Sequence, residues 1–331
     1  MIRYTSEVLF LLALSFSLLP SQARAGFLYV DPSGVTPGGQ TAYTTIQAAV
    51  NAAPANSTII VDPGNYTENV TINQQGIILD GAQSGINPVP GRSGAESVLN
   101  GTITVTAANV TVDGFTVNNN SQYGTSPINL NAQADIATVA VNSVIQNNIV
   151  FNTTLIATGN NPIDILIGPI TTGNPNITPL PLNGLVQNNV VQGNNGNIGI
   201  DHTTGTTVQG NLVNASANQF GTAIDIYYSD NNSILNNEIN NAPASTSPWY
   251  FSAIKLRGAQ GNLVESNYGY LDGQPPIQEL EGSSNNTILN NDLSPFAAPV
   301  PEPASAVLLL TAMVPFFAIT TRSGWHKRRG R

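Results

Sequence analysis

A chain of 331 residues without cysteine has no disulfides to stabilise it, and it offers neither a thiolate metal site nor a cysteine nucleophile. Charged residues make up only 9% of the sequence, against roughly 25% in ordinary soluble domains, whereas 41% is hydrophobic, which favours packed β structure over disorder. The net charge of −9 is unevenly spread: between residues 26 and 299, seventeen acids face Arg92, Lys255 and Arg257, a balance of −14. Because such a body repels nucleic acid, nucleic-acid binding is excluded.

Residues 1–25 have the pattern of a secretory signal peptide. Arg3 supplies the positive start, residues 8–19 form the apolar helical core, and Ala23 and Ala25 make a small-x-small cleavage site. The apolar stretch is too short to span a bilayer, so we expect cleavage rather than anchoring.

The first element predicted in the body is a short helix within residues 43–53. It begins at Thr44 or Thr45, presents one apolar face, and ends before Pro54. A strand, an Asp-Pro-Gly-Asn turn and a second strand follow within residues 58–72. This order resembles the N-terminal cap of pectin-lyase-like β-helices, where a cap covers the apolar end and the unpaired strand edges.

The rest of the body repeats one phrase, in which an Asn pair, or a pair containing Gly or Ser, separates two apolar stretches. Its second Asn recurs with steps of 41, 22, 26, 30 and 24 residues, at Asn148, Asn189, Asn211, Asn237, Asn267 and Asn291. Recurrence on this scale indicates a solenoid whose coils stack about 4.8 Å apart. We expect the corner Asn residues to adopt left-handed geometry and to stack as a hydrogen-bonded amide ladder.

These features predict an all-β fold, a right-handed parallel β-helix over residues 26–295. The repeats resemble the pectin-lyase superfamily across residues 27–295. That superfamily contains lyases, hydrolases, esterases, adhesins and plain surface proteins, so the resemblance implies architecture and leaves function to a site.

Alignment of the coils on the second Asn gives one candidate site. Asp225, Lys255 and Glu279 each lie twelve residues before it, and Asp201 joins them if its loop is two residues shorter. All four should point outward, because each lies beside an inward apolar residue. A second outward column contains Thr203, Tyr227, Arg257 and Glu281.

Three interpretations of this site remain open. The first is a surface salt-bridge ladder, stabilising by roughly 0.2–1 kcal/mol per pair. The second is sugar binding, with aromatic rings stacking on a pyranose and carboxylates bonding its hydroxyls; the residues for this are Tyr227, Tyr228, Trp249, Tyr250, Glu279 and Glu281.

The third is catalysis by Asp201, Asp225, Lys255 and Arg257. Adjacent coils would place the two Asp residues roughly 5 Å apart, and Asp225 and Glu279 about 9.6 Å apart, which brackets the carboxylate spacings of glycosidases. A lyase would instead use Lys255 or Arg257 as the base. The motif sets of polygalacturonases and pectinesterases are absent from the sequence.

The charge of the body bears on the ligand. An acidic surface repels a polyuronate unless calcium bridges the two, so neutral or weakly charged sugars suit it better. No other cofactor is expected, and metal ligation by His202, the single histidine of the body, is not expected either. Strict alternation places His202 in the core or at a corner.

The C-terminal segment, residues 296–331, is predicted to be a sorting tail. Pro301, Glu302 and Pro303 precede an apolar helix over residues 304–319 and a basic end. The segment resembles the PEP-CTERM signal of Gram-negative bacteria, which implies secretion, transient inner-membrane insertion, exosortase cleavage and delivery to the cell surface or extracellular matrix. A retained membrane anchor is the alternative.

We therefore expect a surface or matrix β-helix that contacts exopolysaccharide. A polysaccharide hydrolase or lyase is the second expectation, and a structural surface protein without a ligand is the third.

Overall fold

The computed structural model describes a defined part of the chain, namely residues 25–36, 38–118, 134–152, 163–169, 176–193, 197–215, 222–241, 252–270 and 276–293. The chain divides into two units, Met1–Pro295 and Phe296–Arg331, and the described residues all belong to the first. The predicted signal helix and the sorting tail with Pro301, Glu302 and Pro303 lie outside the described residues.

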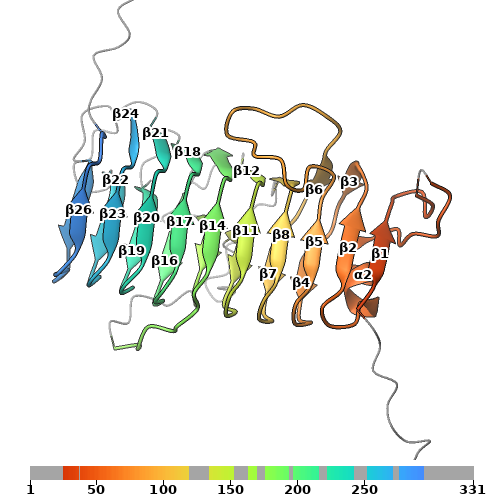
Figure 1. Cartoon of the computed structure of the whole chain (residues 1–331), viewed down its shortest axis with the longest axis horizontal. Coiled ribbons are helices and arrows are strands. Elements are labelled where there is room, and N and C mark those ends of the chain that lie inside the picture. Colours follow the sequence, from red (N-terminus) through yellow and green to blue (C-terminus); the bar gives the residue numbers. More distant parts are fainter. Residues whose placement is uncertain are drawn as a thin grey trace, which may run out of the picture. The chain divides into compact units, whose positions relative to one another are not determined.

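Across the described residues, the strands form three parallel sheets of ten, eight and eight strands, coiled into the predicted right-handed parallel β-helix (Figure 1). The first sheet contains β1 (Phe27–Val30), β2 (Thr58–Val61), β5 (Ile78–Asp80), β8 (Thr111–Asp113), β11 (Val144–Gln146), β14 (Leu185–Gln187), β17 (Thr207–Gln209), β20 (Ser233–Leu235), β23 (Leu263–Glu265) and β26 (Thr287–Leu289). The second sheet contains β4 (Val70–Ile72), β7 (Ile103–Val105), β10 (Ala134–Thr138), β13 (Ile163–Ile167), β16 (Ile198–Asp201), β19 (Thr222–Tyr227), β22 (Ser252–Arg257) and β25 (Ile277–Leu280). The third sheet contains β3 (Gly64–Tyr66), β6 (Ser97–Leu99), β9 (Phe115–Asn118), β12 (Ile149–Asn152), β15 (Val190–Gly193), β18 (Leu212–Ala215), β21 (Glu238–Asn241) and β24 (Tyr268–Tyr270).

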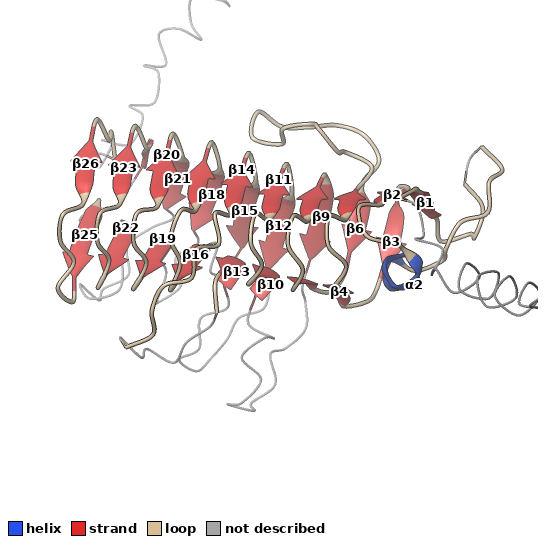
Figure 2. Cartoon of the chain, turned by 60° about the horizontal axis from the view of Figure 1, so that its bottom comes forward, coloured by secondary structure: helices blue, strands red, loops and turns tan. Residues whose placement is uncertain are grey.

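The helix α2 (Ile46–Ala52) packs against β1, β2 and β4 at the N-terminal end of the stack (Figure 2). Thr45 caps it by accepting a hydrogen bond from the Ala48 amide, as predicted. The Glu68 carboxylate accepts two further bonds of 2.8 Å from the Ile46 and Gln47 amides, so a residue of the first coils fixes the helix in place. The predicted Asp-Pro-Gly-Asn turn is shorter than expected, because Gly64 and Asn65 already belong to β3.

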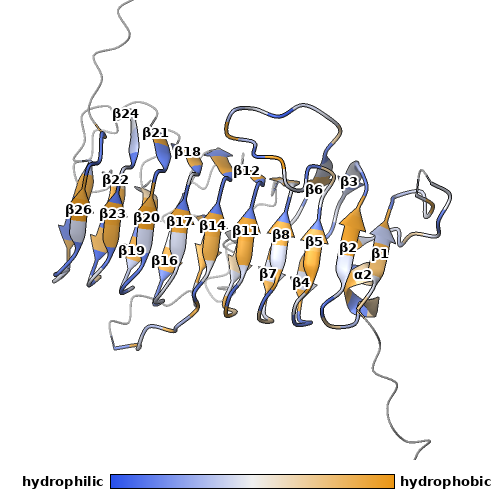
Figure 3. Cartoon of the chain, in the orientation of Figure 1, coloured by the Kyte–Doolittle hydropathy of each residue, from blue (hydrophilic) through white to orange (hydrophobic). Residues whose placement is uncertain are grey.

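The core consists of aliphatic columns that run along the solenoid. In the second sheet, one inward column is continuous from β7 to β25, and its members are Ile103, Ile136, Ile165, Ile198, Ile224, Ile254 and Ile277. All except Ile277 are completely buried. Figure 3 shows apolar strands alternating with polar corners along the stack, as the alternating sequence pattern requires.

The Asn pairs occupy one corner, and their two members have different roles. The first member, or the Gly or Ser in its place, has positive φ; these residues are Asn147, Asn188, Gly210, Asn236, Ser266 and Asn290. The second member forms the ladder. From Asn189 onward, each side-chain oxygen accepts bonds from the backbone and side-chain amides of the Asn one coil earlier, and the oxygen of Asn148, where the ladder begins, accepts from the Phe115 backbone amide. The predicted left-handed geometry and the predicted ladder are therefore both present, but on neighbouring residues.

No helix among the described residues has the length and apolarity needed to cross a membrane.

Candidate functional site

The charged and aromatic residues singled out in the sequence lie on the outward face of the second sheet, over β16, β19, β22 and β25. One outward column contains Gly199, Asp225, Lys255 and Gln278, and the next contains Asp201, Tyr227, Arg257 and Leu280. The corner that follows these strands carries His202, Tyr228, Gly258 and Glu281, each with positive φ. We call the set Asp201, His202, Asp225, Tyr227, Tyr228, Lys255, Arg257 and Glu281 the polar strip.

The predicted columns were wrong for Asp201. It does not align with Asp225, because the step between these two coils is 26 residues both in the strands and at the corner Asn. No loop is two residues shorter, so Asp201 pairs with Tyr227, and Thr203 is a buried corner residue instead of an outward one.

The columns were also wrong for Glu279 and Glu281. Glu279 pairs with Leu256 rather than Lys255, and Leu280 takes the place expected for Glu281 opposite Arg257. The reason is one extra residue in the last corner, since Leu280 pairs with Arg257 whereas Ser284 pairs with Gln260. Glu279 instead accepts a hydrogen bond of 2.8 Å from the Asn286 side chain. The two carboxylate pairs expected for a glycosidase are therefore not aligned.

Arg257 is held in one orientation by two neighbours on β19. Its Nε and Nη2 atoms donate to the two carboxylate oxygens of Asp225, at 3.2 and 2.5 Å. Its guanidinium carbon lies 4.2 Å from the centre of the Tyr227 ring. Burial alone would lower the pKa of Arg257, but the charge and hydrogen bonds of Asp225 outweigh it and raise the pKa. The group thus stays charged, and its side chain is still 30% exposed.

Lys255 differs from Arg257 although both lie on β22. It is only 7% exposed, and no hydrogen bond or ion pair of its ammonium group is found among the described residues. Burial lowers the pKa of Lys255, and the nearby Arg257 charge lowers it further, against the opposing effects of Asp225 and Glu281. A buried cation without an ion pair is costly to fold, and such groups concentrate at functional sites.

Three aromatic rings form the other half of the polar strip. The Tyr227 and Tyr228 rings are 4.6 Å apart, and His202 lies 5.9 Å from the first and 5.4 Å from the second. His202 is fully buried at the corner, which is one of the two positions predicted for it, and its Nδ1 contacts a carboxylate oxygen of Asp201. Both tyrosines therefore pack against each other and against a buried histidine.

Gly258 positions Tyr228, and the sequence analysis missed it. Its φ is +60°, and a Cβ placed there would lie 2.2 Å from the Tyr228 ring. The ring consequently covers the backbone of the next coil, and the Tyr228 hydroxyl donates to Glu281 at 3.2 Å, two coils from its own. The signal available in the sequence was a glycine directly after Arg257, at the position where the preceding coil has Tyr228.

Trp249 and Tyr250, predicted to contribute to sugar binding, lie outside the described residues. In the part of the chain that is described, no group of three or more His, Asp or Glu side chains could hold a metal ion.

Comparison with known proteins gives one family match. Residues 180–294 match a family model described as "Right handed beta helix region". No curated protein matches the chain.

Similar solved structures include an alginate lyase from Paenibacillus sp. str. FPU-7, with 15% identity over 81% of this chain and 98% of that chain and a TM-score of 0.48. Pectin methylesterase PemA from Erwinia chrysanthemi has 10% identity over 77% of this chain and 94% of that chain, with a TM-score of 0.43. Identities and TM-scores this low carry no information about chemistry, which has to come from the polar strip.

Proposed function

We propose that this is an exported β-helix protein that binds polysaccharide through the polar strip. The observation that carries the proposal is the concentration of oriented polar and aromatic groups on three neighbouring strands. The outward column of the second sheet that contains Asp225 and Lys255 is uncharged on the preceding strands, β7 to β16, where its residues are Thr104, Ala137, Leu166 and Gly199.

The chemistry of the strip suits a sugar. Tyr228 offers an aromatic ring supported by Gly258, and the Arg257 guanidinium and the carboxylates offer donors and acceptors whose orientation is already fixed. Such preorganisation lowers the entropy lost on binding. Because Asp225 neutralises Arg257, the exposed groups suit neutral or weakly charged sugars better than a dense polyanion.

A glycan array and calorimetric titration of the full chain test this proposal. We expect binding to at least one bacterial exopolysaccharide, and Tyr228→Ala should weaken it roughly tenfold through loss of the stacking surface. Tyr43→Ala is the matched control, because Tyr43 is a partly exposed tyrosine near the N-terminal end. Absence of binding to every polysaccharide, or equal effects of the two variants, would refute the proposal.

The second candidate function is catalysis, and Lys255 favours it. A lysine whose pKa is lowered gives up its proton more readily and can then act as a general base, and Arg257 lies two residues further along the same strand. In a lyase, this base would remove the proton from the carbon next to a uronate carboxyl group, the glycosidic C–O bond on the neighbouring carbon would break, and the leaving oxygen would take up a proton. The expected products are unsaturated uronates.

Product assays separate the enzyme from the binder. The full chain is incubated with uronate-containing and neutral polysaccharides, and reducing ends and unsaturated products are measured. If the strip is catalytic, Lys255→Met abolishes product formation and retains binding, whereas Tyr228→Ala weakens binding. If no product forms from either class of polysaccharide, catalysis is refuted and binding is the function that remains.

Export is part of the proposal and rests on the sequence of the two ends. The signal peptide directs secretion, and exosortase cleaves the tail near Pro301, Glu302 and Pro303, which places the body at the surface or in the matrix of a Gram-negative cell. Intact-mass measurement of the protein recovered from cells tests both cleavages. A mass that retains residues 304–331 would show an anchor instead.

A further inference from the structure

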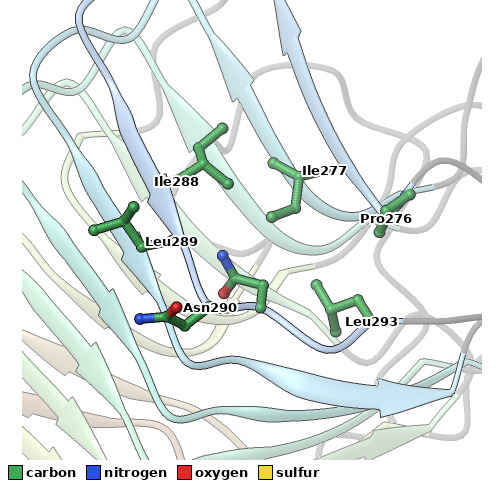
Figure 4. Close-up of a pocket in the computed structure, with 7 residues that line it drawn as sticks. Pro276, Ile277, Ile288, Leu289, Asn290 and Leu293 are labelled. Carbon is green, nitrogen blue, oxygen red and sulfur yellow. The ribbon is translucent and has the colours of Figure 1, made fainter.

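A small pocket of about 60 Å³ lies on the outward face of the second sheet, over β7, β10 and β13. One outward column contributes Thr104, Ala137 and Leu166 to its lining, and the next contributes Thr106, Val139 and Gly168. The larger pocket at the last coil differs, because Ile277 and Ile288 in its lining belong to inward columns (Figure 4). Only the small pocket therefore shares a surface with the polar strip.

The two outward columns lead from the small pocket directly into the polar strip. The first continues through Gly199 to Asp225, and the second through Asp201 to Tyr227. Gly168 lies so close to the next coil that a Cβ on it would come within 1.8 Å of the Asp201 carbonyl oxygen. From β10 to β19 there are three strand steps, which is about 14 Å. A polysaccharide bound to the strip along the solenoid axis thus reaches the small pocket within a few sugar units.

The lining of the small pocket limits what it can hold. The described residues that form it carry no charge, so a charged substituent would lose hydration without gaining an ion pair. Pockets that hold a whole small molecule measure about 300–1,000 Å³, so a pocket of about 60 Å³ admits a substituent of a sugar and not its ring. Ala137, Val139 and Leu166 offer apolar contacts, which favour a methyl group.

Threonine hydroxyls add a polar preference. The Thr106 hydroxyl donates to the Ile72 carbonyl at 3.3 Å, whereas the Thr104 hydroxyl can donate to a ligand. An acetyl group combines a methyl group with a carbonyl acceptor. We propose, on the basis of the binding function given above, that the small pocket holds an acetyl substituent of the polysaccharide bound at the polar strip. The protein therefore prefers acetylated chains.

Matched pairs of polysaccharides test this preference with the full chain. A glycan array carries each polysaccharide in its acetylated form and after mild alkaline removal of ester-linked acetyl groups. Neutral glucomannan oligosaccharides, acetylated and deacetylated, are then titrated by calorimetry. We expect the acetylated form to bind about fourfold more tightly, the factor that burial of one methyl group supplies. Oligosaccharides of N-acetylglucosamine, compared with those of glucose, distinguish amide-linked from ester-linked acetyl groups.

Ala137→Leu fills the small pocket and tests it directly. Ala137 is partly exposed, so the larger side chain extends outward and leaves the core unchanged. We expect this variant to bind deacetylated chains as the natural protein does and to lose the preference for acetylated ones. Thr71→Leu is the matched control, because Thr71 is exposed in the same outward column one coil earlier. The control should keep the preference.

The possible results separate this inference from the binding function. Equal binding of acetylated and deacetylated chains would overturn the inference and leave the polar strip as the binding surface. A preference that survives Ala137→Leu, or that Thr71→Leu abolishes equally, would overturn it as well. Absence of binding to every polysaccharide would refute the binding function and the inference together.

Discussion

Removal of one interior Asn from the corner ladder tests how the coils are held in register. The Asn237 side chain is completely buried and takes part in four hydrogen bonds. Its oxygen accepts from the backbone amide and the side chain of Asn211 at 3.1 and 2.9 Å. Its side-chain nitrogen donates to the Val208 carbonyl at 3.0 Å and to the Asn267 side-chain oxygen at 2.9 Å.

In Asn237→Ala, some of these partners keep other bonds and some do not. The Asn211 side chain retains the Val186 and Gln209 carbonyls, and the Asn267 oxygen retains the Asn237 backbone amide. The Asn211 backbone amide loses its side-chain acceptor, and the Val208 carbonyl loses a donor. The Val208 carbonyl still belongs to the β17–β20 pairing, so the Asn211 amide is the one buried group left unpaired; at about 1–3 kcal/mol for such a group, we expect a destabilisation of about 1–3 kcal/mol.

Asn291→Ala is the matched control, because Asn291 ends the described ladder and is partly exposed. Water can replace its bonds, so about 1 kcal/mol is expected. Equilibrium urea unfolding followed by circular dichroism gives both free energies, with unchanged m-values as the test of comparability. Equal losses in the two variants would refute the role of the ladder.

Further predictions concern the polar strip. Lys255→Met should stabilise the protein by on the order of 1 kcal/mol at neutral pH, since it removes a buried cation. Because the pKa of Lys255 is lowered, the folded protein binds fewer protons than the unfolded chain between that pKa and 10.5. The stability advantage of Lys255→Met over the natural protein should therefore fade as pH rises through this window. A stability difference that stays constant with pH would contradict this. Asp225→Asn should cost about 1 kcal/mol in urea unfolding through Arg257, and Arg257→Ala in the Asp225→Asn background should then cost less than it does alone. Gly258→Ala should destabilise by about 1–2 kcal/mol and displace Tyr228, which the tyrosine near-ultraviolet circular dichroism will report; an unchanged spectrum would argue against the close contact.

The sequence predicted the fold because the fold depends on local and repeated signals. Alternating Ile and Val residues determine which side of each strand faces the core, and the corner Asn recurs at every turn of the last six coils. Capping by Thr45 was predictable for the same reason, as it needs only neighbouring residues.

The polar strip was predicted less completely. The predicted register was confirmed for two pairs, Asp225 beside Lys255 and Tyr227 beside Arg257. The alignment of Asp201 was wrong because it assumed a shorter loop, whereas the strands and the corner keep the same step of 26 residues. The alignment of Glu279 was wrong because one added corner residue shifts its partner, and corner lengths carry no periodic signal.

The central claim is that the polar strip is the surface that binds polysaccharide. Hydroxyl-radical footprinting of the full chain, with and without the polysaccharide selected on the array, measures it at individual side chains. If the polar strip binds the polysaccharide, oxidation of Tyr227 and Tyr228 falls severalfold on binding, whereas oxidation of Tyr43, near the N-terminal end, stays unchanged. Unchanged oxidation of Tyr227 and Tyr228, with protection on the first or third sheet instead, would contradict it.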